Sequence, residues 1–163
     1  MKAYFEKLST EHKAVAHSNK SRHFFRSIDH FLNDDSNNLS NFPAVVMDSL
    51  EGKITGQNSD NKTDLMQSGV MFIKKVTDSD DDAGIDLVHR EMKALALSFV
   101  ARMERDAQMC ETRDSKFLQL FDPLTVKYRI YGPVFDQCYG VHIAFTCGHI
   151  AAISFNDGEW NIQ

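Results

Sequence analysis

The feature that most constrains the fold is a long apolar stripe between residues 82 and 108. Its members recur three or four residues apart, at Ile85, Val88, Met92, Leu95, Phe99 and Met103. Residues at this spacing share one face of a 3.6-residue repeat, so the stripe predicts one long amphipathic helix. The acidic run 78–82 precedes it, where carboxylates favour the positive end of a helix dipole. Such a helix needs a sheet or other helices to cover its apolar face.

Alternating residues near the C-terminus predict strands. Leu124, Val126, Tyr128 and Ile130 alternate with polar residues, and Tyr139, Val141, Ile143, Phe145 and Cys147 repeat the pattern. Gly132-Pro133 is expected to end the first strand, and Gly148 to turn the chain into a third strand over 150–155. A further turn is expected at Asn156-Asp157-Gly158. We therefore expect an antiparallel meander, with Val88, Met92, Leu95 and Phe99 packing on the face that carries Val126, Tyr128, Ile143 and Phe145.

The N-terminal part is expected to hold a helical segment over residues 1–35. Its second half fits a helix best, with a stripe formed by Phe24, Phe25, Ile28, Phe31 and Leu32. Residues 42–47 read as a short buried strand, and 69–77 as a second strand. The largely polar residues 48–67 exceed the usual length of a connection, so they form either a long functional loop or an extended hairpin arm.

These elements predict a single α+β domain over residues 1–163. Its expected core is an antiparallel or mixed sheet covered by the long amphipathic helix. A chain of 163 residues is long enough to bury one sizeable core.

Composition restricts the partners. The net charge of −5 argues against nucleic-acid binding through the whole surface. A local basic patch exists at Lys13, Lys20, Arg22 and Arg26, and a solvated helix face is the preferred interpretation of it over a binding site. No apolar run is long enough to span a membrane. The three cysteines, Cys110, Cys138 and Cys147, are expected to be reduced, in a cytoplasmic protein.

The common signature motifs of nucleotide binding, hydrolysis, zinc proteolysis and redox chemistry do not occur in the sequence. It contains no Gly-rich phosphate loop, G-x-S-x-G, H-E-x-x-H or C-x-x-C. His142, Cys147 and His149 could supply zinc ligands, but strand alternation places His142 and Cys147 on opposite faces. We expect no catalytic activity, cofactor or bound metal.

The order of elements resembles the tail-terminator and head-tail neck proteins of tailed bacteriophages and related contractile injection systems. The resemblance covers most of the chain, through FFRSIDHFL, NFPAVVM, the polar stretch 48–67, GVMFIKKV, the helix through FVARM and the meander from LTVKYRIYG. It implies a viral structural protein of the virion that forms a ring, commonly a hexamer, joining the tail tube to the neck. DNA would pass through this ring without sequence-specific binding.

Contacts between subunits or with partners are expected at the first strand and in the polar stretch. The residues are Phe42, Pro43, Glu51, Lys53, Gln57, Asp60, Lys62 and Asp64. Two rival functions stay open. The closing ISFNDGEWNI resembles the last strand of nuclear-transport-factor-like cone folds, which bind small molecules in a pocket, and a small adaptor protein is the third possibility.

Overall fold

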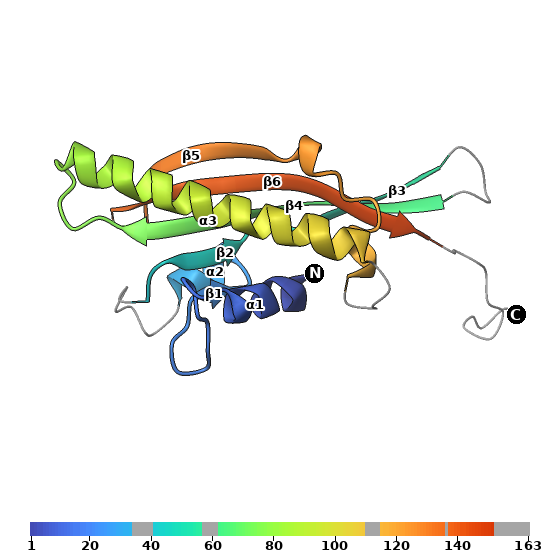
Figure 1. The fold of residues 1–163 in the computed structure, drawn as a ribbon, viewed down its shortest axis with the longest axis horizontal. Helices are drawn as coiled ribbons and strands as arrows, with labels where there is room; N and C mark the ends of the chain where they lie inside the picture. The colour runs from blue at the N-terminus through green and yellow to red at the C-terminus, as the bar shows by residue number, and fades with distance from the viewer. Residues whose placement is uncertain (34–40, 57–61, 110–114, 136, 152–163) are drawn as a thin grey trace, which may run out of the picture.

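The computed structural model describes residues 1–33, 41–56, 62–109, 115–135 and 137–151. Figure 1 shows a long helix lying across an elongated sheet, with the N-terminal elements along one margin. The elements are α1 (Lys2–Glu11), β1 (Phe24–Phe25), α2 (Ile28–Leu32), β2 (Ala44–Met47), β3 (Glu51–Gly56), β4 (Lys62–Lys75), α3 (Asp82–Gln108), the 3-10 turns Lys116–Leu118 and Pro123–Thr125, β5 (Lys127–Val134) and β6 (Cys138–Ile150).

The sheet is mixed but mostly antiparallel. Its strands lie in the order β1-β2-β4-β6-β5, and β3 pairs with the first part of β4. Only β1 and β2 run parallel among the described pairs. The two longest strands, β4 and β6, pair from Thr63 opposite Ile150 to Lys75 opposite Cys138. The predicted α+β class, with a mixed sheet covered by a long helix, is therefore confirmed.

Helix α3 covers one face of the sheet, which we name the α3 face. The helix has the predicted bounds, and Asp81 caps it because its Oδ1 accepts a hydrogen bond from the Gly84 amide at 2.9 Å. The ring of Phe99 meets that of Phe72 of β4 edge to face, with centroids 5.0 Å apart. Helix α1 adds to the same core through Phe5, whose ring lies 5.6 Å from that of Phe145.

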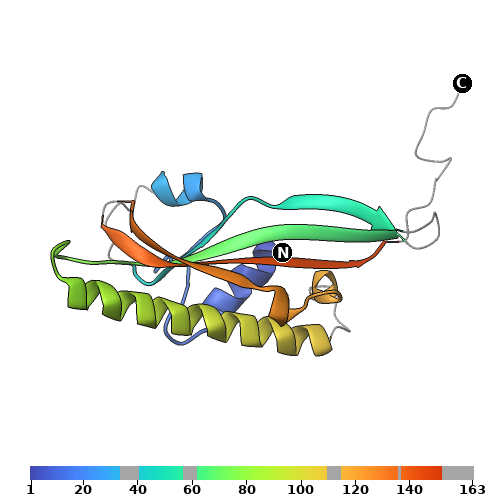
Figure 2. The same ribbon diagram turned by 90° about the horizontal axis from the view of Figure 1, so that it is seen from above.

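Helix α2 lies on the opposite face of the sheet (Figure 2), which we name the α2 face. This face carries a second and smaller core. Phe31 of α2 meets Phe25 of β1 edge to face at 5.0 Å. Both pack with the sheet side chains Ala44, Val46, Met71, Ile73 and Cys138. This core covers only the end of the sheet where β2 pairs with β4.

The N-terminal prediction was partly wrong. Phe24 and Phe25 lie in a strand, opposite Val45 and Val46 of β2, and not in the helix that the apolar stripe suggested. As neighbours in a strand they point to opposite faces, so Phe24 enters the larger core and Phe25 the smaller one. The helical part of this stripe is limited to α2, where the Ser27 side chain accepts from the His30 amide.

The described part of residues 48–67 forms the hairpin arm that was one of the two alternatives. Strand β3 pairs with β4 from Glu51 opposite Gln67 to Gly56 opposite Lys62. Strand β4 therefore begins well before the predicted start at residue 69. The arm extends past the C-terminal end of α3 (Figure 1).

The meander also differs from its prediction at two glycines. Gly148 does not turn the chain but lies inside β6, opposite Leu65, because β4 is long enough to pair with residues up to Ile150. Gly132-Pro133 does not end β5, although the pairing with β6 is irregular between Tyr131 and Val134. The turn expected at 156–158 and most of the strand expected over 150–155 lie outside the described residues.

Candidate assembly surface

The predicted contact residues fall into two separate places. Glu51 and Lys53 of β3 and Lys62 and Asp64 of β4 lie together on the hairpin arm. Gln57 and Asp60 lie outside the described residues. On the arm, Glu51 and Lys53 are exposed, whereas Lys62 and Asp64 are half-buried.

Phe42 and Pro43 lie at the other end of β4. They precede Ala44, which pairs with Ile73, whereas the arm ends at Lys62 of the same strand. Phe42 packs against the smaller core, and the Pro43 carbonyl oxygen accepts a hydrogen bond from His23 Nδ1 at 2.9 Å. The structure thus does not bring these two residues together with the arm, and Phe42 is occupied by packing within its own chain.

The arm presents an open strand edge. In the part of the chain that the structure describes, β3 has a strand partner on one side only, which is β4. Ile54 is 61 % exposed, and Leu50, just before β3, is also exposed. An edge with unpaired backbone groups and exposed apolar side chains invites another strand.

Among the described strands, a second open edge lies along β5, which contains Gly132-Pro133. Tyr128 and Ile130 are each 53 % exposed, and Leu124 before the strand is 92 % exposed. Leu97 of α3 is also half-exposed. We name Leu97, Leu124, Tyr128 and Ile130 the β5 flank. Of these four residues, Tyr128 was predicted to pack under the helix, and the alternation correctly indicated the face to which it points, but β5 lies at the margin of the sheet. Leu124, which was predicted to begin the strand, lies in the 3-10 turn Pro123–Thr125.

Helix α3 contacts Tyr128 of β5 through Lys93. Lys93 Nζ lies 4.5 Å from the centre of the Tyr128 ring and donates a hydrogen bond to its hydroxyl oxygen at 3.0 Å. Val126 is half-buried and packs against the larger core, together with Ile143 and Phe145 as predicted. Tyr128 is the predicted core residue that remains largely uncovered.

Charged groups border β5 on the α2 face. Lys127 and Arg129 are exposed there, and Arg129 pairs with His142 of β6. His142 Nε2 lies 3.4 Å from Asp48 Oδ2, without the geometry of a hydrogen bond. Burial lowers the pKa of His142 below its usual value, and Arg129 lowers it further while Asp48 opposes the shift.

Two of the three candidate zinc ligands, His142 and Cys147, point to opposite faces of the sheet. His142 faces the α2 side, whereas Cys147 lies in the core on the α3 side, with Sγ 3.7 Å from the Met66 carbonyl oxygen. Burial raises the pKa of the Cys147 thiol to about 12. Among the described residues, no three His, Cys, Asp or Glu side chains gather as metal ligands would.

No helix within the described ranges is long and apolar enough to cross a membrane. Comparison of the sequence with models of known families and with curated proteins finds no match.

Proposed function

We propose that the protein is a structural assembly protein whose copies join side by side into a closed ring, as the resemblance to tail terminators implies. The observation that supports this most is the β5 flank. Tyr128 and Ile130 belong to an edge strand, point to the same side as the buried core, and remain half-exposed in the single chain. Exposed apolar side chains beside an open strand edge are typical of a protein interface.

The directions of the strands suit such joining. In the order β3-β4-β6-β5 every neighbouring pair is antiparallel. A second copy related by rotation about a ring axis would bring its β3 against β5 of the first copy. Since β3 and β5 run in opposite directions, the antiparallel alternation would continue across the boundary without interruption. A contact between two different edges, repeated around an axis, closes into a ring.

Side-chain direction selects a register. Two conditions fix it: all of Lys127–Tyr131 pairs with β3 of the next copy, and the α3 faces of the two copies are aligned. Tyr128 then lies opposite Ile54, and Ile130 lies opposite Gly52. The half-exposed apolar residues of the two edges would then cover each other. The same register places Lys53 opposite Arg129, an unfavourable pair that Glu51, diagonal to Arg129, would offset in part.

The two edges are offset along the strands. The centre of β3 lies level with Gly148 of β6, through Leu65 of β4, whereas the centre of β5 lies level with His142. Six residues of strand correspond to roughly 20 Å, so each copy would be shifted by that distance from the next. A closed ring accommodates such a shift when its strands tilt relative to the axis, as they do in β-barrels.

The remaining details rest on the resemblance alone. These are the hexameric state, the tail tube and neck as partners, a place in the virion, and the passage of DNA through the ring. The arm would serve as the part of each subunit that reaches its neighbour.

Native mass spectrometry and negative-stain electron microscopy of the concentrated protein test the proposal. We expect a single closed oligomer that appears as a ring, and we expect Ile130→Lys to remain monomeric while it folds normally. A monomer that tightly binds a small molecule would favour the cone-fold alternative. A monomer or dimer that binds one other protein would favour an adaptor.

A further inference from the structure

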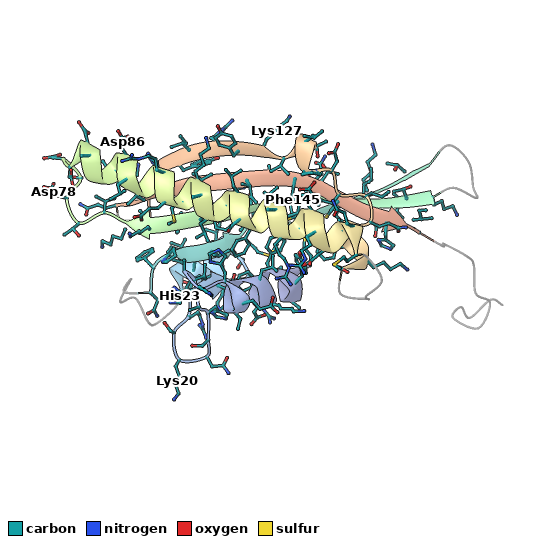
Figure 3. All side chains as sticks on the ribbon, in the orientation of Figure 1. Lys20, His23, Asp78, Asp86, Lys127 and Phe145 are labelled. Carbon is teal, nitrogen blue, oxygen red and sulfur yellow. The ribbon has the colours of Figure 1, made fainter. Side chains whose placement is uncertain are left out.

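A second surface lies in the connection between α1 and α2 and is independent of the strand edges. Residues 12–28 contain no aspartate or glutamate, whereas the chain as a whole carries a net charge of −5. The segment holds Lys13, Lys20, Arg22 and Arg26, and all four side chains are exposed. The solvated helix face that the sequence favoured is absent, because residues 14–23 form a loop that protrudes from the sheet with Lys20 near its tip (Figure 3).

Hydrogen bonds hold this loop in a defined shape. His17 is buried, and its Nδ1 accepts from the amides of His23 at 3.1 Å and Phe24 at 3.3 Å. The Ser18 amide donates to the Ser21 carbonyl oxygen at 2.9 Å, and the Ser21 amide donates to Ser18 Oγ at 3.1 Å. Lys20 and Arg22 are therefore carried on a hydrogen-bonded backbone, which lowers the entropic cost of binding.

A polar cleft of about 420 Å³ lies at the base of the loop. Its lining consists mainly of groups that can donate hydrogen bonds, and the residues are His17, Ser18, Asn19, Arg22, Arg26 and His30, with Phe24 and Glu6. Glu6 is the acidic residue among them, and Arg26 binds its Oε2 at 2.6 Å. Because Nδ1 of His17 is an acceptor, its Nε2 carries the proton, and this nitrogen lies 4.0 Å from Glu6 Oε1.

We propose that this loop and cleft bind the phosphate backbone of nucleic acid, without reading its sequence. Lys and Arg side chains bind phosphates by displacing counterions, and hydroxyl, amide and backbone donors add hydrogen bonds that fix position. The described part of this surface offers no helix or strand pair shaped to enter a groove, so base readout is not expected. The inference does not depend on ring formation.

Fluorescence anisotropy with a short labelled DNA duplex at low salt tests the proposal. We expect the weak affinity of non-specific binding, with a dissociation constant on the order of 10⁻⁶ to 10⁻⁴ M that rises steeply with salt. The variant Lys13→Gln/Lys20→Gln/Arg22→Gln should bind at least about tenfold more weakly. The slope of log K against log salt should become shallower by about one for each residue removed.

A matched control variant distinguishes DNA binding at this loop from a general effect of the net charge of the protein. Lys2→Gln/Arg105→Gln/Lys116→Gln removes the same charge from exposed positions on other elements, and it should leave the affinity for DNA nearly unchanged. Lys20→Gln alone, at an exposed loop position, is the variant least able to disturb folding and should reduce the slope by about one.

Three results would overturn the proposal. The first is an absence of binding by the wild-type protein at low salt. The second is an equal loss of affinity in the control variant. The third is self-association that depends on Lys13, Lys20 and Arg22 without any DNA binding, which would assign the loop to an acidic surface of another copy.

Discussion

Strands β5 and β6 are neighbours with the same alternating pattern, but their apolar side chains differ in exposure. Tyr128 pairs with Ile143 and Ile130 pairs with Val141, so all four side chains point to the α3 face. Val141 and Ile143 are each 1 % exposed, whereas Tyr128 and Ile130 are each 53 % exposed. Alternation therefore indicates the side to which a residue points, but it does not indicate whether anything covers that side.

This difference in exposure arises because one helix is not wide enough to cover β5 as well as β4 and β6. The buried stripe of α3 packs over β4 and β6, as the contact of Phe99 with Phe72 shows. Toward β5 the helix presents polar groups: Lys93 contacts the ring and hydroxyl of Tyr128, and His89 Nε2 donates a hydrogen bond to the Tyr131 carbonyl oxygen at 3.1 Å. The β5 flank thus lies beyond the reach of the apolar stripe, and a neighbouring molecule could cover it.

The largest effect is expected where helix and sheet meet. Phe99 is buried and contacts Phe72, so Phe99→Ala should lower the free energy of unfolding by about 3–5 kcal/mol. Chemical denaturation measures this loss. An unchanged unfolding transition would show that α3 is not the main cover of the sheet.

A pair of equivalent substitutions tests the contrast between the two strands. In the monomer, Ile143→Ala should cost about 2–5 kcal/mol, because it leaves a cavity in the core. Ile130→Ala should cost about 1 kcal/mol or less, since half of its side chain already meets water. Equal losses in denaturation experiments on the monomer would contradict the description of the β5 flank as uncovered.

A charge exchange sharpens the proposed register. Lys53→Glu would replace a like-charge pair with an ion pair to Arg129 of the neighbouring copy. A gain of about 1 kcal/mol corresponds to roughly fivefold tighter association in analytical ultracentrifugation. The double variant Lys53→Glu/Arg129→Glu restores a like-charge pair and should lose that gain; tight association of both variants would exclude this register.

The smallest effect on stability is expected from protonation of His142, which lies in β6 opposite Arg129 of β5. Burial lowers the pKa of His142, so the unfolded chain takes up this proton at a higher pH than the folded chain does. Stability from this group is present above about pH 6.5 and is lost as the pH falls below it. His12 and His17 shift in the same direction, also because of burial.

His142→Gln should therefore make the loss of stability on acidification shallower, although it should not abolish it. Thermal unfolding of both proteins at a series of pH values measures the difference. A steeper dependence in the variant would mean that Asp48 outweighs burial and that the sign of the shift is reversed.

Much of the fold could be predicted because its longest patterns are local. The α3 stripe and the alternation in β6 each span enough residues to specify an element and the face that it buries. The prediction failed where a distant partner decides. Phe24 and Phe25 fit a helix stripe, but pairing with β2 makes them a strand. Gly148 fits a turn, but the length of β4 keeps it in β6.

The candidate surface could be predicted only in part, for a related reason. The polarity and length of residues 48–67 indicated either a long functional loop or an extended hairpin arm. The β5 flank carries a core-like pattern, and its exposure depends on β5 being an edge strand, which the order of elements along the chain does not specify.

Disulfide trapping between the two edges tests the central claim most directly. The double variant Ile54→Cys/Tyr128→Cys cannot form this bond within one chain, because β4 and β6 separate β3 from β5 by three strand spacings, roughly 14 Å. Under mild oxidation we expect a ladder of covalent oligomers that ends at one closed species, and neither single variant should give it. A folded double variant that stays monomeric, or that forms only the dimers seen with the single variants, would contradict the proposed joining of β3 to β5.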